Sequence, residues 1–136
     1  MNKFLLDTNV VSEIRKPRPH GAVIAWLSSQ QDDRLLISAV TMGELQKGIE
    51  RTRLQDPSKA SEIERWADEL AASYQILPMD TLCFREWGSI MCGKPPELLE
   101  DAMIAATARI HGLIVATRDE RDFRRLDVQT FNPFKN

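Results

Sequence analysis

Histidine and cysteine are scarce in this chain of 136 residues, which contains two of each. His20 and His111 fall in a predicted loop and at a predicted helix end, so neither a histidine base nor a zinc site has support. Cys83 and Cys92 lie in one segment predicted to be helical, too far apart along it for a disulfide. We therefore expect reduced thiols.

The chain also lacks any long hydrophobic run. No apolar stretch approaches the roughly 20 residues of a membrane span, and the first residues do not have the layout of a signal peptide. A cytoplasmic protein is therefore expected. The net charge is −2, which argues against a strongly cationic nucleic-acid binder. Such a partner would need a local basic patch, or a metal ion held by acidic residues.

Several familiar catalytic patterns are missing as well. There is no Gly-x-Ser-x-Gly nucleophile elbow, no glycine-rich phosphate loop and no cysteine–histidine pairing signal. The chemistry that remains open to this chain rests mainly on its carboxylates.

Short apolar segments alternate with segments of helical periodicity. Strands are predicted at residues 4–6, 34–38, 75–79, 113–116 and 128–131. Strands that alternate with helical segments of ten or more residues are typical of a parallel sheet covered on both faces. Pro78 favours a sheet edge for the third strand, or a position at the strand end for the proline itself. We therefore expect an α/β protein with a single domain spanning residues 1–136.

The first strand ends in Asp7, which is followed by Thr8 and Asn9. A carboxylate at the tip of a buried strand is costly unless another group binds it. Ligands of parallel sheets bind beyond the carboxyl ends of the strands. That rule places Asp7, the turn of residues 38–44 and the turn of residues 117–122 at one edge of the sheet.

Glu44 has two possible roles. Thr41 and Glu44 fit the capping box in which the two side chains satisfy backbone N–H groups at a helix start. Alternatively, Glu44 extends the acidic edge, because it follows the second strand closely and lies one helical turn deep.

Asp101 lies with Ile104, Ala105 and Ala108 on the apolar stripe of its helix. An acidic residue near a helix start also favours the helix dipole, but a dipole contact needs no burial. Asp101 is therefore a candidate for the acidic edge. Its neighbour Glu100 is expected to point elsewhere and to be solvated.

Asp119 and Asp122 follow the clearest strand in the sequence. Either could be a plain turn residue or helix cap, or part of a charge-balanced surface with the neighbouring arginines. The coincidence of several acidic positions at one edge favours a site instead. Clustered carboxylates must be neutralised by protons or by a cation, and oxygen ligands suit Mg²⁺ or Mn²⁺. Such an ion activates water and stabilises phosphoryl charge, which predicts phosphodiester hydrolysis.

These motifs together resemble the PIN-domain family. They are Asp7-Thr8-Asn9 after the first strand, Glu44 at the start of the helix after the second strand, and the segments 101–108 and 113–123. The resemblance covers nearly the whole chain and is closest to the VapC toxins of bacterial toxin–antitoxin pairs, including the branch related to FitB. It implies a three-layer α/β/α fold with a central, mostly parallel sheet of about five strands.

The resemblance also implies an activity and partners. Members are Mg²⁺- or Mn²⁺-dependent endoribonucleases that cleave structured RNA, often transfer or ribosomal RNA. They commonly form homodimers and are neutralised by a VapB-type antitoxin whose tail fills the active-site groove.

Site residues can be carried over position by position. The implied catalytic residues are Asp7, Glu44, Asp101 and Asp119. The implied metal ligands are Asp7, Asp101, Asp119 and Asp122, and the implied supporting residues are Thr8, Asn9 and Thr117. Many relatives have Asn in place of Asp119 and an acidic residue in place of Asp122. Position directly after the strand ranks Asp119 ahead of Asp122.

Candidate contacts to RNA phosphates are Arg15, Lys16, Lys47, Arg118 and Arg121, although a solvated side chain is the ordinary alternative for each. Two other functions stay open. One is a PIN-like metal-dependent nuclease that acts on DNA. The other is a catalytically degenerate module that binds metal or a basic partner, although none of the acidic positions is missing here.

Overall fold

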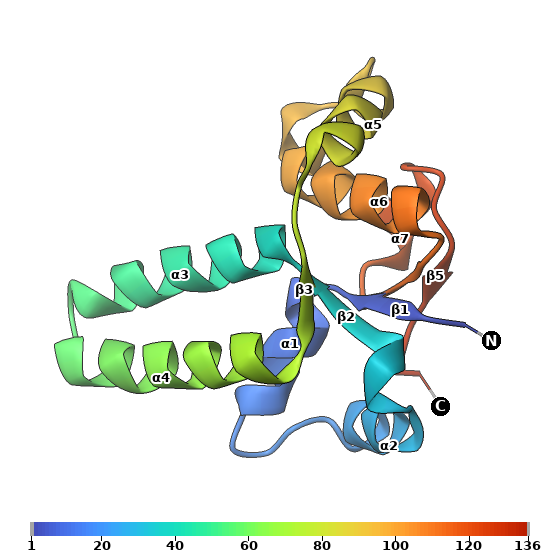
Figure 1. Ribbon diagram of the computed structural model, residues 1–136. Helices are drawn as coiled ribbons and strands as arrows, with labels where there is room; N and C mark the ends of the chain where they lie inside the picture. The colour runs from blue at the N-terminus through green and yellow to red at the C-terminus, as the bar shows by residue number, and fades with distance from the viewer. Residues whose placement is uncertain (1, 136) are drawn as a thin grey trace.

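The chain builds three layers around one parallel sheet, as Figure 1 shows. The computed structural model describes residues 2–135. Its strands are β1 (Phe4–Leu6), β2 (Leu35–Ser38), β3 (Gln75–Leu77), β4 (Ile114–Ala116) and β5 (Thr130–Phe131). Their spatial order is β3-β2-β1-β4-β5, and each neighbouring pair is parallel. The α/β class and the parallel sheet are therefore confirmed.

Seven α-helices connect these strands within residues 2–135. They are α1 (Thr8–Arg15), α2 (Gly21–Ser29), α3 (Ala39–Arg53), α4 (Pro57–Ser73), α5 (Thr81–Met91), α6 (Leu99–His111) and α7 (Glu120–Arg124). Helices α3 and α4 form a long hairpin that projects from the body of the molecule (Figure 1). None of the helices in this part of the chain is long and apolar enough to cross a membrane.

Side chains alternate between the two faces of the sheet along each strand, and each face packs against a hydrophobic core. Both faces are therefore buried. Leu5 and Val115 point into one core, where they meet Ile104 on α6. Leu6 and Ile37 belong to a second core, which also holds buried residues of α1, α2 and α4. The strands are therefore continuous apolar runs, as the sequence predicts.

The strand limits differ from the prediction at several ends. The segment 32–34 forms a 3-10 helix before β2, and β3 stops at Leu77 before Pro78. Because β3 is an edge strand, the positional prediction from this proline is confirmed. The last strand has two residues in place of the predicted four.

Helix α3 begins earlier than predicted. The Ser38 hydroxyl accepts a hydrogen bond from the backbone N–H of Val40 at 3.1 Å, so Ser38 caps the helix. Thr41 then lies inside the first turn and is fully buried. The predicted Thr41–Glu44 capping box is therefore wrong, and the Glu44 carboxylate is free to make another contact.

The strand order reverses between β1 and β4. From β1 the chain proceeds outward to β2 and β3, whereas β4 and β5 lie on the other side of β1. Such a switch point opens a crevice at the carboxyl ends of the strands. Asp7 directly follows β1 and its N–H donates to the carbonyl of Ala116, the last residue of β4, at 2.9 Å. Asp7 therefore lies at the switch point.

Candidate active site

Asp7 is held by three hydrogen bonds at the carboxyl end of β1. Its Oδ1 accepts from the Thr8 N–H at 2.8 Å, which makes Asp7 the cap of α1. Its Oδ2 accepts from Thr117 Oγ1 at 2.7 Å and from Asn9 Nδ2 at 3.2 Å. The side chain is only 4% exposed. Burial raises its pKa, and the hydrogen bonds from Thr117 and Thr8 oppose that shift.

Thr117 and Asn9 also organise the turn after β4. Thr117 Oγ1 accepts from the N–H of Asp119 at 2.9 Å, and Asn9 Oδ1 accepts from the N–H of Arg118 at 3.3 Å. Asn9 Nδ2 lies 3.4 Å from Thr117 Oγ1. The start of α1 and the turn after β4 therefore form one connected polar network around Asp7.

Glu44 joins this network through Thr8. Thr8 Oγ1 donates to Glu44 Oε1 at 2.7 Å and lies 3.1 Å from Thr41 Oγ1. Because the Thr8 proton goes to Glu44, the Thr41 hydroxyl can donate to Thr8. The two residues that suggested a helix cap thus connect α3 to α1 at the edge of the crevice.

Asp101 faces the other carboxylates from α6. Burial raises its pKa to about 7, and the charges of Asp7, Asp119, Asp122 and Glu100 add to that shift. An aspartate that keeps its proton near neutral pH lies among like charges with too little water to screen them. The structure therefore brings Asp101 to the edge where Asp7 lies.

Glu100 was expected to be solvated, and that expectation is wrong. Burial raises the pKa of Glu44 to about 7, and the Glu100 carboxyl adds to the shift through a hydrogen bond and through its charge. Glu100 therefore faces Glu44. Its place in the first turn of α6 offered no signal, because acidic residues are common there for helix-dipole reasons.

Asp119 and Asp122 occupy different places in the turn and in α7. Asp119 precedes α7 and is exposed, and its charge raises the pKa of Asp7. Asp122 lies inside α7, is half-buried, and acts on Asp101. Both carboxylates therefore belong to the acidic edge, with Asp119 on the side of Asp7.

The donor set has the chemistry of a divalent-cation site. The acidic groups around Asp7 are carboxylates with hydroxyl and amide neighbours, and two of the carboxyls retain protons near neutral pH. Within residues 2–135, however, no three Asp, Glu, His or Cys side chains already converge as a preformed cage. Oxygen ligands of this kind are those that Mg²⁺ takes, and Mg²⁺ keeps several of its waters and takes few protein ligands.

The five candidate phosphate contacts are dispersed around the site. Lys16 pairs with Glu13 at 2.9 Å, and Arg118 lies over the ring of Phe134 at 3.9 Å. The other three are more distant from one another: Arg15 stacks over Trp66, Lys47 lines a cavity on the outer part of α3, and Arg121 lies on α7. Proximity to Asp119 therefore singles out Arg118 and Arg121.

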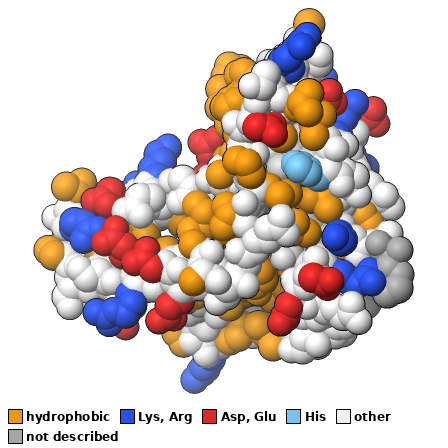
Figure 2. All heavy atoms as spheres, in the orientation of Figure 1, with side chains coloured by type: hydrophobic (Ala, Val, Ile, Leu, Met, Phe, Trp, Pro, Cys, Tyr) orange, Lys and Arg blue, Asp and Glu red, His pale blue; other side chains and the backbone are white. Residues whose placement is uncertain are grey.

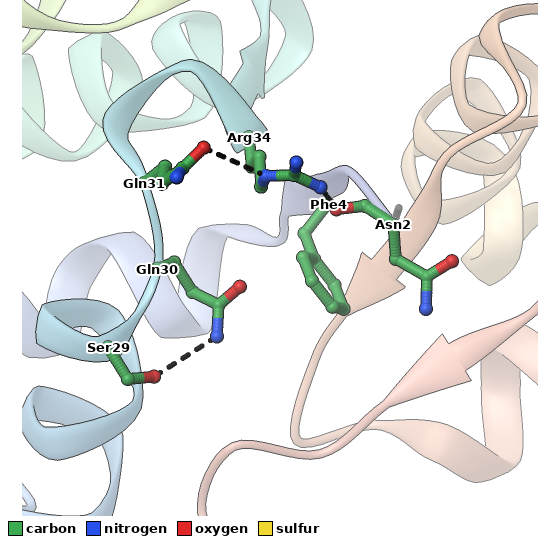
Figure 3. Close-up of a pocket in the computed structure, with 6 residues that line it drawn as sticks. All are labelled: Asn2, Phe4, Ser29, Gln30, Gln31 and Arg34. Atoms are coloured by element: carbon green, nitrogen blue, oxygen red, sulfur yellow. Dashed lines mark hydrogen bonds between the residues drawn. The ribbon is translucent and has the colours of Figure 1, made fainter.

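A second polar cavity lies at the opposite edge of the sheet. Figure 3 shows Arg34 between Gln31 and the backbone of Asn2, with the Phe4 ring beside them. These residues precede or begin β1 and β2, so this cavity is at the amino ends of the strands. Its lining contains no carboxylate, which leaves the acidic crevice as the better candidate for hydrolytic chemistry.

A parallel α/β/α sandwich with an acidic switch-point crevice defines a class of α/β proteins that bind their ligands beyond the strand ends. Within that class, the chain belongs to the PIN domain family, whose model matches residues 4–129. PIN-domain ribonucleases are generally dependent on divalent metal ions. The resemblance inferred from the motifs is therefore confirmed.

Three relatives match nearly the whole chain. "VapC ribonuclease Y4jK" of Sinorhizobium fredii is 33% identical, covering 97% of this chain and 98% of the relative. "Toxin FitB" of Neisseria gonorrhoeae is 37% identical, covering 96% and 98%. "tRNA(fMet)-specific endonuclease VapC" of Shigella flexneri is 30% identical, covering 93% of each chain.

Solved structures share the fold. FitAcB from Neisseria gonorrhoeae superposes with a TM-score of 0.82 at 35% identity, covering 98% of this chain and 99% of the other. The fold also occurs in a toxin–antitoxin complex from Klebsiella pneumoniae, with a TM-score of 0.74 at 22% identity over 96% and 98% of the chains. The predicted three-layer PIN architecture is confirmed.

Proposed function

We propose that this chain is a divalent-metal-dependent endoribonuclease, the toxin of a toxin–antitoxin pair. The observation that carries the proposal is the position of Asp7, Asp101 and Glu44 near the switch point, where burial raises all three pKa values and neighbouring carboxylates add to each shift. Repulsion between carboxylates destabilises the folded chain, and a bound cation would remove it. The family and the names of two relatives give the reaction, which is hydrolysis of a phosphodiester bond in RNA.

The residues that would hold the ion are Asp7, Asp101, Asp119 and Asp122. Their oxygens favour Mg²⁺, with Mn²⁺ as the alternative, over the softer metals that prefer sulfur or imidazole. A bound ion supplies Lewis acidity that activates water and neutralises charge on a phosphoryl oxygen. These four residues, with Glu44, are our proposal for the catalytic centre.

The protein's own side chains prepare this centre. Thr117 and Asn9 orient Oδ2 of Asp7, while the Thr8 N–H orients Oδ1, so that the carboxylate cannot rotate away from the crevice. The carboxyls of Glu44 and Asp101 hold protons near neutral pH in the ion-free site. These carboxyls would lose their protons in a site that holds a cation, because a positive charge favours the ionised carboxylates.

RNA is the proposed substrate class, and transfer RNA is the first candidate because of the specificity named for the Shigella relative. Purified protein should cleave bulk transfer RNA with Mg²⁺ or Mn²⁺ and should stop when EDTA is added. Asp7→Asn and Asp101→Asn should be inactive, whereas Asp68→Asn, a change at an exposed position on α4, should leave cleavage unchanged. Metal-independent cleavage that survives both site changes, or a preference for DNA of the same sequence, would contradict the proposal.

The proposed antitoxin surface is a groove that leaves the site between α1, α3 and α4. It begins at Thr8 and Glu44 and has a volume of about 250 Å³. Its walls include Ile49, Ile63 and Trp66, which suit an apolar peptide segment. Co-expression of a small DNA-binding protein from a neighbouring gene should suppress toxicity, and substitution of Ile63 by arginine should restore it.

We also propose that the chain forms a homodimer through α5 and α6. Leu82 and Phe84 on α5 are 61% and 46% exposed, and Leu99 and Ile110 on α6 are exposed as well. Figure 2 shows hydrophobic side chains gathered over the end of the molecule where α5 lies. Charged side chains predominate instead along the α3–α4 hairpin. Exposed apolar groups of this kind mark a surface that another protein covers.

A further inference from the structure

Glu13 is a buried carboxylate that lies outside the acidic crevice. Among the described residues, the buried acidic side chains are Asp7 and Glu13, each 4% exposed. Both belong to the region of α1, with Asp7 as the cap of the helix and Glu13 near its end. A buried carboxylate requires partners, and the partners of Glu13 suggest a role.

Two cations share this one carboxylate. Oε1 of Glu13 accepts from Lys16 Nζ at 2.9 Å and also lies 4.0 Å from Arg118 Nη2. Oε2 accepts from the backbone N–H of His20 at 2.8 Å. The Lys16 and Arg118 side chains are 53% and 52% exposed. One negative charge cannot balance both, so a positive charge remains at the surface.

Arg118 is held on three sides. Its backbone N–H donates to Asn9 Oδ1, its guanidinium lies over the Phe134 ring at 3.9 Å, and Glu13 Oε1 lies 4.0 Å from Nη2 of the guanidinium. Phe134 is fixed in turn, because its N–H donates to Asn132 Oδ1 at 2.9 Å. A stacked guanidinium keeps its outer edge free to bind an anion.

This arginine opens onto a groove beside the acidic crevice. The groove has a volume of about 450 Å³, and its basic lining residues are Arg118, Arg121, Arg124 and Lys135. Lys135 is paired with Glu120, which also lines the groove, at 2.9 Å, so the three arginines are the cations left to meet an anion. Asp119 and Asp122 line its inner side, and Arg118 directly precedes Asp119 in the chain. The groove therefore runs from the proposed catalytic centre to a row of cations, and its size suits a nucleotide.

We propose that Arg118 binds an RNA backbone phosphate that neighbours the cleaved one, and that Glu13 is the positioning residue that holds Arg118 for this contact. The inference rests on the proposed ribonuclease function. RNA fits the groove because an anionic backbone needs cations close to a cluster of carboxylates that would otherwise repel it. Stacking on Phe134 restricts the Arg118 side chain before the phosphate binds, so the side chain loses less conformational entropy on binding.

The Glu13→Gln variant distinguishes a positioning effect of Glu13 on Arg118 from an effect of net charge on RNA binding. Glutamine has the same shape and keeps an acceptor for the His20 N–H, but it loses the charge that attracts Arg118. Removing a negative charge near RNA should tighten binding if only net charge matters. If Glu13 positions Arg118, the same change should weaken binding by about threefold to tenfold.

The measurement is fluorescence anisotropy of labelled bulk transfer RNA, with EDTA present to prevent cleavage. Arg118→Ala should weaken binding by about tenfold and lower the slope of log K against log salt by roughly one phosphate contact. Arg118→Lys should recover little of the loss, because an ammonium neither stacks nor binds two oxygens in parallel. Arg85→Ala, at an exposed arginine on α5, is the matched control.

A double-mutant cycle completes the test. In the Arg118→Ala background, Glu13→Gln should no longer weaken binding. Equal weakening in both backgrounds, or tighter binding of Glu13→Gln in both, would overturn the positioning role while RNA cleavage continues. If the unsubstituted protein neither binds nor cleaves RNA, the proposed function fails together with this inference. Thermal melts of each variant verify that the fold is retained.

Discussion

Thr117 Oγ1 lies 2.7 Å from Asp7 Oδ2, and this hydrogen bond joins the ends of β4 and β1 across 110 residues of sequence. Both side chains are buried. The hydroxyl of Thr117 donates to Asp7 and accepts from the backbone N–H of Asp119, so it fixes the Asp7 carboxylate and the backbone of Asp119 at once. The threonine is therefore as much a part of the site's geometry as the acids are.

Replacing Thr117 with valine tests this alignment. Valine fills the same space, but Asp7 loses a buried hydrogen bond, which should lower the free energy of unfolding by about 2 kcal/mol. Cleavage should fall as well, since Asp7 and Asp119 lose a common anchor. Urea unfolding and initial cleavage rates provide the measurements. Thr130→Val, at a half-buried strand position, is the control, and equal losses in the two variants would contradict the role assigned to Thr117.

The stability of the ion-free protein should depend on pH. The pKa of Asp101 rises from its ordinary value of 3.8 to about 7 in the folded chain. Folding therefore favours the protonated form, and this contribution to stability is complete below about pH 4 and is lost as the pH rises towards 7. Glu44 acts in the same direction, from 4.5 to about 7.

Thermal melts in EDTA across this pH range check the prediction. The melting temperature should fall as the pH rises, and Mg²⁺ should restore it near neutral pH. Asp101→Asn should flatten the pH dependence and remove most of the response to Mg²⁺. Asp68→Asn should behave like the unsubstituted protein. A melting temperature that rises between pH 4 and pH 7 in EDTA would contradict the raised pKa values of Asp101 and Glu44.

Asp119 and Asp122 should contribute unequally to catalysis. The charge of Asp119 acts on both Asp7 and Asp101, whereas that of Asp122 acts on Asp101 from inside α7 and has the smaller effect there. We expect Asp119→Asn to slow cleavage by on the order of a hundredfold and Asp122→Asn by about tenfold. Cleavage rates over a range of Mn²⁺ concentrations measure both effects. The reverse order would place Asp122 at the centre of the site.

A glutamate at Phe84 should separate the proposed dimer. Burying an unpaired charge in an apolar interface costs several kcal/mol, about as much as a modest interface contributes. Light scattering after gel filtration should report a dimer for the unsubstituted chain and a monomer for Phe84→Glu. Leu54→Glu, at a residue 88% exposed on the far end of the α3–α4 hairpin, should remain dimeric. A monomeric unsubstituted chain would remove the basis of this proposal.

The sequence predicts the arrangement of elements well and their ends less well. Apolar runs and helical periodicity locate the five strands and the helices between them, because both depend on near neighbours in the chain. The start of α3 is different, since Ser38 and Thr41 both suit a helix cap and only packing decides between them. Because Ser38 is the cap, Glu44 is not part of a capping box, and its carboxylate accepts a hydrogen bond from Thr8 instead.

Sequence alone determined that a carboxylate follows the first strand, that others follow the second and fourth strands, and that parallel strands gather them at one edge. The tertiary structure alone decided which groups meet there. Thr117 reaches Asp7, Glu100 faces Glu44, and Glu13 meets Arg118 only through the crossover connections and the rotation of each helix about its axis. These relationships depend on packing between distant segments, which leaves no local pattern in the chain.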